Sequence, residues 1–170
     1  MTQRTILPFG DSILRKKARP VTAFDEKLFK LLDDLADTLY AKEGRAGLAS
    51  PQIGILRRVA VIDDGSGLIE LINPEIVVMD GEQFGTEACL SFPGYLGNVK
   101  RAQAVQIRFN NRLGEAVEMK AEGFLARCIQ HEIDHLDGIL FIDHMKEPYL
   151  IHEKTKHRVS LMEAQRLTRA

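Results

Sequence analysis

The residues best suited to chemistry are two histidines on one short stretch, His131 and His135, with Glu132 between them. Four residues along an α-helix advance about 400° and rise about 6 Å, so the two imidazoles lie one above the other on one face. At that spacing both can bind a single metal ion, and Glu132 can then reach a water molecule beside it. The motif indicates a metal-dependent hydrolase. The alternative is a charged amphipathic helix that carries two histidines by chance.

Two histidines do not complete a hydrolytic metal site, and the position of the third ligand is a separate question. The metzincin motif places another His six residues after His135, where this chain has Phe141, so that subclass is excluded. Cys128 precedes His135 by seven residues, about 10 Å along a helix, so an ion held between the two histidines would be hard for it to reach. We therefore expect the third ligand from a different segment.

Composition and charge narrow the class of protein. Hydrophobic residues make up 45% and charged residues 28% of the 170-residue chain, which predicts a single catalytic domain over residues 1–170. The net charge of -1 gives no general attraction to DNA or to acidic membranes. The first residues lack the apolar core of a signal peptide, and no apolar run is long enough to span a bilayer. We expect a cytoplasmic protein whose two cysteines, Cys89 and Cys128, are thiols or ligands rather than a disulfide.

Hydrophobic periodicity places the elements that must position these residues. Five leucines at helical spacing predict a core-packing helix over residues 25–42, and the motif helix is expected over residues 122–136. Strands are expected at residues 58–63, 68–73, 75–79, 99–109 and 116–121. An extended arm is expected over residues 1–21, and residues 158–167 can form a helix. The fold class is α+β: antiparallel β-strands surrounding a central metal-binding helix, with a C-terminal helix.

Two short stretches outside the motif helix are unusual in composition. Residues 47–54 hold two glycines, a proline and other small residues around Gln52, which indicates backbone that another group approaches closely. A tight connection without function is the alternative. Residues 87–94 hold Cys89, and Pro93 and Gly94 place that cysteine on a turn rather than inside a long element.

Taken together, these two stretches and the histidine helix resemble the three signature motifs of the peptide deformylase family. The family pattern is a G-x-G-L-A-A-x-Q-like loop, an E-G-C-L-S turn and a Q-H-E-x-D-H-L helix, and the resemblance spans almost the whole chain. Three departures stand out: Arg45 replaces the usual first Gly, Ser50 the second Ala, and Ala88 the Gly before the cysteine. They affect the expected fit of a substrate rather than the expected chemistry.

The resemblance implies a metal site made by Cys89, His131 and His135. Cys89 is then the ligand from outside the helix. A thiolate and two imidazoles leave one position open on a tetrahedral metal, as hydrolysis requires. The family usually works with Fe(II), and zinc, nickel or cobalt can occupy the same ligands.

The resemblance also implies the reaction, which is removal of the formyl group from N-formyl-methionyl peptides with release of formate. Glu132 takes a proton from the attacking water and delivers it to the leaving amine. Negative charge on the formyl oxygen is stabilised by the metal, the Gln52 side-chain amide and the Leu90 backbone N–H.

Substrate-binding residues follow from position. Phe124 and Cys128 lie one and two turns before His131 and are expected on the inward face of the helix, beside the methionine side chain. Cys128 is expected to be a small buried wall residue, with a redox or ligand role as the alternative. Gly47 is expected to pair with the peptide backbone as an added strand. We expect a structural role for Asp134 and assign no chemistry to the remaining histidines, His144, His152 and His157.

The expected partners are formylated peptides and the ribosome near the peptide exit, and the expected state is a monomer. Residues 146–170 carry six Lys and Arg residues against three Glu, so a solvated terminal helix or a salt-dependent contact with ribosomal RNA are both open. Two other functions remain: a zinc peptidase of the H-E-x-x-H type, and a catalytically silent, metal-stabilised binding module on the ribosome. The intact Gln52, Cys89 and Glu132 argue against a silent module.

Overall fold

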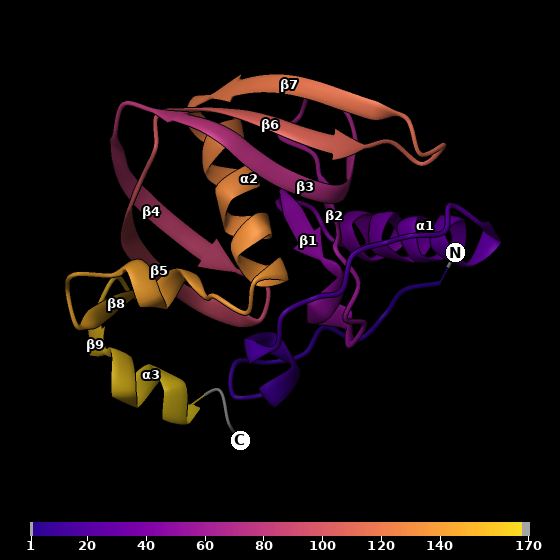
Figure 1. Ribbon diagram of the computed structural model, residues 1–170. Helices are drawn as coiled ribbons and strands as arrows, with labels where there is room; N and C mark the ends of the chain where they lie inside the picture. Colours follow the sequence, from indigo (N-terminus) through magenta and orange to yellow (C-terminus); the bar gives the residue numbers. More distant parts are fainter. Residues whose placement is uncertain (1, 168–170) are drawn as a thin grey trace.

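Two antiparallel sheets and three α-helices make up the part of the chain that the computed structural model describes, residues 2–167 (Figure 1). The first sheet has the strand order β1-β2-β3-β6-β7, and the second has the order β4-β5-β8-β9. In chain order the elements are η1 (Ser12–Arg15), α1 (Glu26–Tyr40), β1 (Gly47–Ala49), η2 (Ser50–Ile53), β2 (Val59–Ile62), β3 (Ile69–Asp80), β4 (Gln83–Cys89), β5 (Phe92–Arg101), β6 (Ala104–Asn110), β7 (Ala116–Glu122), α2 (Gly123–Leu136), η3 (Phe141–His144), β8 (Tyr149–His152), β9 (Arg158–Ser160) and α3 (Leu161–Leu167).

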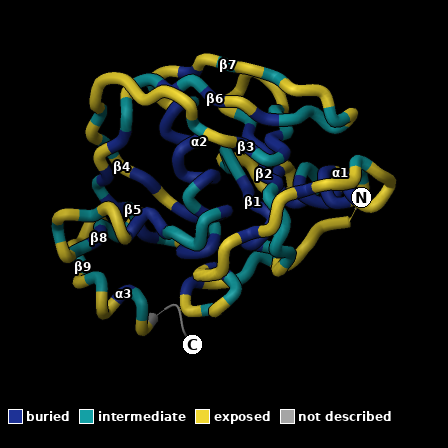
Figure 2. The backbone as a smooth tube through the Cα atoms, in the orientation of Figure 1, coloured by how far each residue is buried: buried dark blue, intermediate teal, exposed yellow. Residues whose placement is uncertain are grey.

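Helix α2 lies between the two sheets, and its central part is buried (Figures 1 and 2). It packs against β1, β2 and β7 of the five-stranded sheet, and its apolar residues join a core cluster with Ile62, Leu71 and Ile107. The four-stranded sheet closes the other side of the helix with a second cluster around Phe92 and Phe141. The predicted α+β arrangement of antiparallel strands around this helix, followed by a C-terminal helix, is confirmed.

Helix α1 packs on the five-stranded sheet at strands β1 and β2. Asp25 caps its first turn by accepting a hydrogen bond from the Leu28 backbone N–H at 3.0 Å. The predicted leucine stripe is buried against β1 and β2, so this helix supports the edge strand that borders the site. The predicted range of 25–42 is one residue early at its start and two residues late at its end.

Several predicted element boundaries were wrong. The strand expected over residues 99–109 is two strands, β5 and β6, which belong to different sheets. The strands expected at 68–73 and 75–79 form one long strand, β3, with a shift in pairing register between Ile72 and Glu75. Pro93 and Gly94 lie inside β5 rather than on the turn. The β8–β9 hairpin was not expected. Its second strand, β9, occupies residues 158–160, where helix was predicted.

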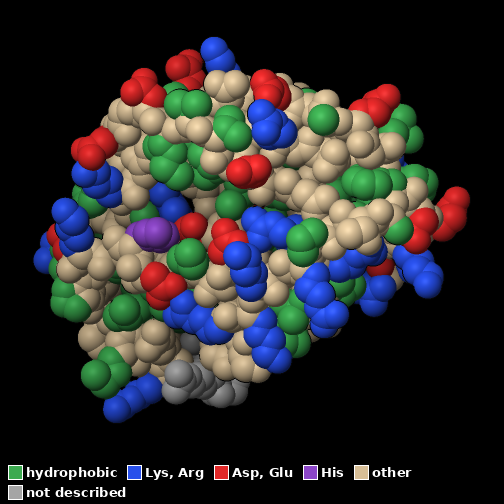
Figure 3. All heavy atoms as spheres, in the orientation of Figure 1, with side chains coloured by type: hydrophobic (Ala, Val, Ile, Leu, Met, Phe, Trp, Pro, Cys, Tyr) green, Lys and Arg blue, Asp and Glu red, His purple; other side chains and the backbone are tan. Residues whose placement is uncertain are grey.

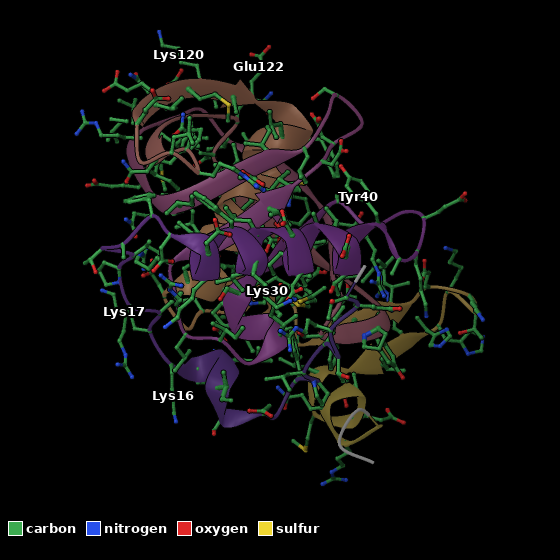
Figure 4. The ribbon with its side chains drawn as sticks, turned by 90° about the vertical axis from the view of Figure 1, so that its right-hand side faces the viewer. Lys16, Lys17, Lys30, Tyr40, Lys120 and Glu122 are labelled. Carbon is green, nitrogen blue, oxygen red and sulfur yellow. The ribbon has the colours of Figure 1, made fainter. Side chains whose placement is uncertain are left out.

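Positive charge gathers on the N-terminal arm. Figure 3 shows Lys and Arg side chains grouped at the lower right of the front face. In Figure 4 Lys16 and Lys17 point away from the body of the protein. The arm, predicted to be extended, contains the short helix η1, and residues 2–11 and 16–21 form no helix. Arg169, counted in the basic tail, lies outside the described residues.

Within residues 2–167, no helix is long and apolar enough to cross a membrane.

Candidate metal and catalytic site

The structure brings Cys89 beside the two motif histidines. Cys89 is the last residue of β4, and His131 and His135 lie one turn apart on α2. Cys89 Sγ lies 3.3 Å from His135 Nε2, and one ligand atom from each of the three residues lies within 4.8 Å of the others. The imidazole rings are 5.0 Å apart at 72° to each other. All three side chains are buried, so a group bound between them would be shielded from bulk water.

These donors fit a metal ion of the transition series. One thiol sulfur and two imidazole nitrogens are the ligands that zinc and ferrous iron bind in proteins, and three such donors leave one coordination position open. Glu132 Oε2 and His135 Nδ1 are buried and have no hydrogen-bond partner among the described residues. Buried polar atoms normally have partners, so an unpaired carboxylate oxygen beside the three donors indicates a place for water or substrate.

His131 is oriented by the carboxylate of Glu87, which is not one of the predicted metal ligands. Glu87 Oε1 lies 2.8 Å from His131 Nδ1, which leaves Nε2 of that ring for the metal side. Arg101 donates to both Glu87 oxygens at 2.8 and 2.9 Å, and Arg127 donates to one at 2.7 Å. Burial opposes ionisation of Glu87, but hydrogen bonds from Arg101 and His131 outweigh it and hold its pKa far below the usual range.

Sequence reasoning did not single out Glu87, Arg101 or Arg127 for this role. Glu87 lies within the cysteine-containing stretch, which was a usable signal. The two arginines lie on other elements, and neither their spacing nor their surroundings in the sequence distinguishes them.

Burial and geometry give Glu132 the properties of an acid/base group. Burial is the largest effect and raises the pKa of Glu132 to about 7, although the neighbouring His131 opposes this rise. A group with a pKa near the working pH can both accept and return a proton. The Glu132 side chain fills the space beside Gly47, where an added Cβ would lie 2.9 Å from its Cδ. The predicted close approach to the backbone of residues 47–54 is therefore the approach of this glutamate.

Gln52 is fixed with its amide N–H groups toward the cysteine. Gln52 lies in η2, and its Oε1 accepts a hydrogen bond at 2.8 Å from the backbone N–H of Ala49, the residue that precedes this short helix. Its Nε2 consequently faces Ser91 Oγ at 3.2 Å and Cys89 Sγ at 3.6 Å. Leu90 directly follows Cys89 and is half-buried. Both residues line the same cavity.

That cavity has a volume of about 540 Å³, and its wall includes Cys89, His131 and Glu132. Its wall includes Cys128, which is 8% exposed and whose pKa burial raises to about 12, so the thiol is neutral. Phe124 also lines the cavity, but its side chain is 58% exposed. Phe124 belongs to the first turn of α2 and lies on the same cavity as Cys128 and His131, so its role in substrate binding stays a prediction.

The three departures from the family pattern lie in different surroundings. Arg45 and Ala88 line the cavity, as expected for positions that affect substrate fit. The Arg45 guanidinium also donates to the Thr38 carbonyl near the end of α1. Ser50 is fully buried, donates to the Ile55 carbonyl at 2.5 Å and does not line the cavity.

Asp134 has partners that suit the predicted structural role. Its Oδ2 accepts from Arg101 Nη1 at 2.6 Å and lies 2.8 Å from His144 Nε2. His152 packs edge-on against Tyr95, and His157 is exposed. None of the three histidines outside the motif is among the grouped donors.

An antiparallel α+β fold around an H-E-x-x-H helix, with a cysteine beside the histidines, defines a metal-dependent hydrolase. Comparison with known proteins specifies the family. The profile of the polypeptide deformylase family matches residues 3–149. A peptide deformylase from Caldanaerobacter subterraneus subsp. tengcongensis is 53% identical over 84% of this chain and 89% of its own length. One from Thermoanaerobacter pseudethanolicus is 49% identical over 94% of this chain and 98% of its own.

Solved structures agree. The crystal structure of peptide deformylase from Thermotoga maritima is 42% identical, with a TM-score of 0.84 over 86% of this chain and 100% of that one. A Legionella pneumophila peptide deformylase is 43% identical, with a TM-score of 0.84 over 97% and 92%. The chain belongs to the peptide deformylase family, and it is a metal-dependent hydrolase that removes N-terminal formyl groups.

Proposed function

We propose that Cys89, His131 and His135 hold the catalytic metal and that Glu132 is the acid/base residue. The observation that carries this assignment is the group of three buried donors within 4.8 Å, beside a buried carboxylate oxygen that has no partner among the described residues. When bound, the metal would activate a water molecule and polarise the formyl oxygen. The chain's own residues transfer the proton, stabilise the negative charge and bind the peptide.

Proton transfer belongs to Glu132. Its carboxylate accepts the proton of the attacking water and returns it to the nitrogen of the leaving amine, and the products are formate and a free N-terminus. A pKa of about 7 suits both halves of this transfer. Glu132 therefore changes protonation state during each turnover.

Two hydrogen-bond donors stabilise the negative charge that develops on the formyl oxygen. The Gln52 amide faces the site because its oxygen is held by Ala49 N–H, and it can donate without reorganising. The Leu90 backbone N–H is the second donor, next in the chain to the proposed ligand Cys89. Both roles are supported by position around the cavity.

The substrate is the formyl-methionyl end of a newly made polypeptide. We place the methionine side chain against Cys128, with Phe124 at the mouth of the cavity. Strand β1 is at the edge of its sheet, so the backbone at Gly47 is available to pair with the peptide as an added strand. This pairing would align the formyl group with Glu132, which packs beside the same glycine.

Iron(II) is the metal we propose, with zinc, nickel or cobalt able to occupy the same donors. A thiolate and two imidazoles suit all four ions. We further propose that the chain forms one catalytic domain, acts as a monomer in the cytoplasm and works near the peptide exit of the ribosome. The family match over residues 3–149 and the nature of the substrate support this setting.

The test is formate release from formyl-Met-Ala-Ser by protein purified without oxygen, with metal content measured on the same sample. We expect release with about one metal per chain, because a thiolate and two imidazoles form one site. Glu132→Gln should retain the metal and lose turnover. Full activity of Glu132→Gln would refute the acid/base role, and cleavage of the peptide bond instead of formate release would point to a peptidase. Full metal loading of the unmutated chain without either product would favour the silent module.

A further inference from the structure

Phe141, the residue that replaces a third motif histidine, lies directly against His131. Its ring centroid is 6.0 Å from the imidazole centroid, with the planes 24° apart, which is a stacked arrangement. Phe141 is only 1% exposed. It is the first residue of η3, the short helix that follows α2. The ring thus lies stacked beside a proposed metal ligand, with the two planes close to parallel.

The Phe141 ring has little room to move away from the imidazole. Phe9 and Phe92 contact it at centroid distances of 6.0 and 6.5 Å. On the β5 side the ring lies on bare backbone, because a Cβ at Gly97 would lie 2.9 Å from Phe141 Cε2. The ring is therefore fixed by its surroundings and can in turn fix His131.

The last residue of η3 reaches His131 by a second route. His144 Nε2 lies 2.8 Å from Asp134 Oδ2, and that oxygen accepts from Arg101 Nη1 at 2.6 Å. Because a carboxylate only accepts, His144 is the donor in this contact. Arg101 holds Glu87 with two hydrogen bonds, and Glu87 accepts from His131 Nδ1 at 2.8 Å. An unbroken chain of polar contacts thus joins the exposed His144 to the buried ligand.

Helix η3 is anchored independently of the site. Asp143 accepts from the Leu140 backbone N–H at 2.9 Å and closes the first turn. The same carboxylate pairs with Arg15 of η1, at 3.0 Å for its second oxygen. The element is therefore held by its own cap and by the N-terminal arm in addition to its contacts with α2.

We propose that η3 is a positioning element for the metal site. Phe141 fixes the tilt of the His131 ring, and His144 limits its rotation through Asp134, Arg101 and Glu87. The two contacts act on different motions of one imidazole, so both are needed to hold Nε2 at the place where the ion binds. This inference rests on the proposed ligand role of His131.

The first test compares Phe141→Leu with Phe109→Leu, a matched change of a buried phenylalanine that lies on β6 in a different core cluster. The readouts are the rate of metal loss to a chelator, the visible spectrum of the cobalt-substituted protein, and kcat and KM. Residues behind a metal ligand typically change affinity or activity about 10–100-fold. We expect Phe141→Leu to speed metal loss about 10-fold, shift the spectrum and lower kcat with little change in KM. Phe109→Leu should alter only the free energy of unfolding.

The second test uses His144, whose side chain is exposed. His144→Gln keeps an N–H donor for Asp134, whereas His144→Phe removes it. We expect His144→Phe to speed metal loss about 3-fold, less than a change beside the ligand, and His144→Gln to restore the wild-type rate. His157→Phe is the matched control. This residue directly precedes β9, and its change should leave the rate of metal loss unaltered.

The outcomes separate this proposal from the proposed function. If the unmutated chain binds no metal at Cys89, His131 and His135, the ligand assignment itself fails. If it binds metal and Phe141→Leu behaves like Phe109→Leu, the positioning role of Phe141 is refuted while the ligands stand. Equal rates for His144→Phe and His144→Gln would refute the polar route through Asp134.

Discussion

At the level of single residues, the site depends on a backbone position that has no room for a side chain. Gly47 packs against the carboxylate end of Glu132, and an added Cβ would lie 2.9 and 3.0 Å from its Cδ and Cγ. Such contacts are closer than carbon atoms tolerate, so one group has to move. The glycine therefore determines where the proposed acid/base residue sits.

We predict that Gly47→Ala lowers kcat at least about 10-fold, because a 1 Å displacement of a catalytic group is costly. Metal content should be unchanged, since the three proposed ligands lie elsewhere. Formate release and metal analysis of the same purified variant provide the check. A variant with the kcat of the unmutated enzyme would show that Glu132 can act from a displaced position.

Gln52 offers a second prediction at this scale. Replacing it with Ala removes a donor that faces the developing oxyanion, and such losses lower kcat about 100–1000-fold. Ser91→Ala is the matched control, because it removes only one acceptor of the Gln52 amide, at 3.2 Å. Steady-state kinetics should show a large fall for Gln52→Ala and a small one for Ser91→Ala. Equal kinetics for the two variants would exclude Gln52 as an oxyanion donor.

Sequence reasoning predicted the site residues whose types and spacing suggest a chemical role, and it did not predict residues that become neighbours of the site only through tertiary packing. His131, Glu132 and His135 are recognisable because their spacing on a helix has few other uses. Cys89 needed the family resemblance, since its distance from the histidines depends on the course of β4 around α2. Arg101 could not be identified, because an arginine on a strand is ordinary until its partner Glu87 is known to be buried.

At the level of elements, α1 is tied to the N-terminal arm by a buried carboxylate. Asp34 is 3% exposed and accepts from Arg4 at 2.6 and 2.9 Å and from Lys30 at 3.3 Å. Burial alone would raise the pKa of Asp34, but these hydrogen bonds outweigh it and lower the pKa. A lowered pKa in the folded state means that the pair stabilises the protein above the unfolded pKa, and that this stability is lost as pH falls through the folded pKa.

We predict that Arg4→Ala lowers the free energy of unfolding by about 1 kcal/mol at neutral pH. The difference from the unmutated protein should shrink as the pH falls below about 4 and Asp34 becomes protonated in both proteins. Urea unfolding at a series of pH values measures it. Arg108→Ala, which breaks an exposed pair with Glu118, is the control and should show little difference at any pH. A pH-independent loss for Arg4→Ala would mean that lost packing, not charge, is responsible.

Helices and strands were predicted correctly where one hydrophobic pattern dominated the sequence. Their boundaries were predicted wrongly where pairing with other strands determines them. The leucine stripe of α1 has no competing interpretation. Pro74, by contrast, indicated a break, yet β3 continues past it because the pairing with β6 shifts register there. Residues 99–109 read as one strand, and only the tertiary structure shows that Ala102 and Gln103 connect two sheets. The short β8–β9 hairpin has too few residues for a periodic signal.

At the level of the whole molecule, the proposed ligands come from both halves of the fold. Cys89 ends a strand of the four-stranded sheet, whereas His131 and His135 belong to the helix that packs on the five-stranded sheet. An ion that binds all three would therefore join the two sheets across the core, and its binding free energy would add to the free energy of unfolding.

We predict that removing the metal lowers the urea midpoint and that adding it back restores the midpoint. At a free metal concentration about 1000 times the dissociation constant the gain is about 4 kcal/mol. Cys89→Ser should gain much less from the same metal, because a hydroxyl is a poorer ligand than a thiolate for these ions. Identical unfolding curves with and without metal would show that the ion does not join the two sheets.

The distance of Cys89 from His135 along the chain, 46 positions, has a consequence during synthesis. A growing chain exposes the thiol first, and β5, β6, β7 and most of α2 must still be made before the second histidine exists. Until both histidines have been made, the sulfur lacks the full set of imidazole neighbours that it has in the folded protein, and a thiol without them is open to oxidation. The proposed metal site can therefore form only late in the synthesis of each copy, after residue 135 has been added.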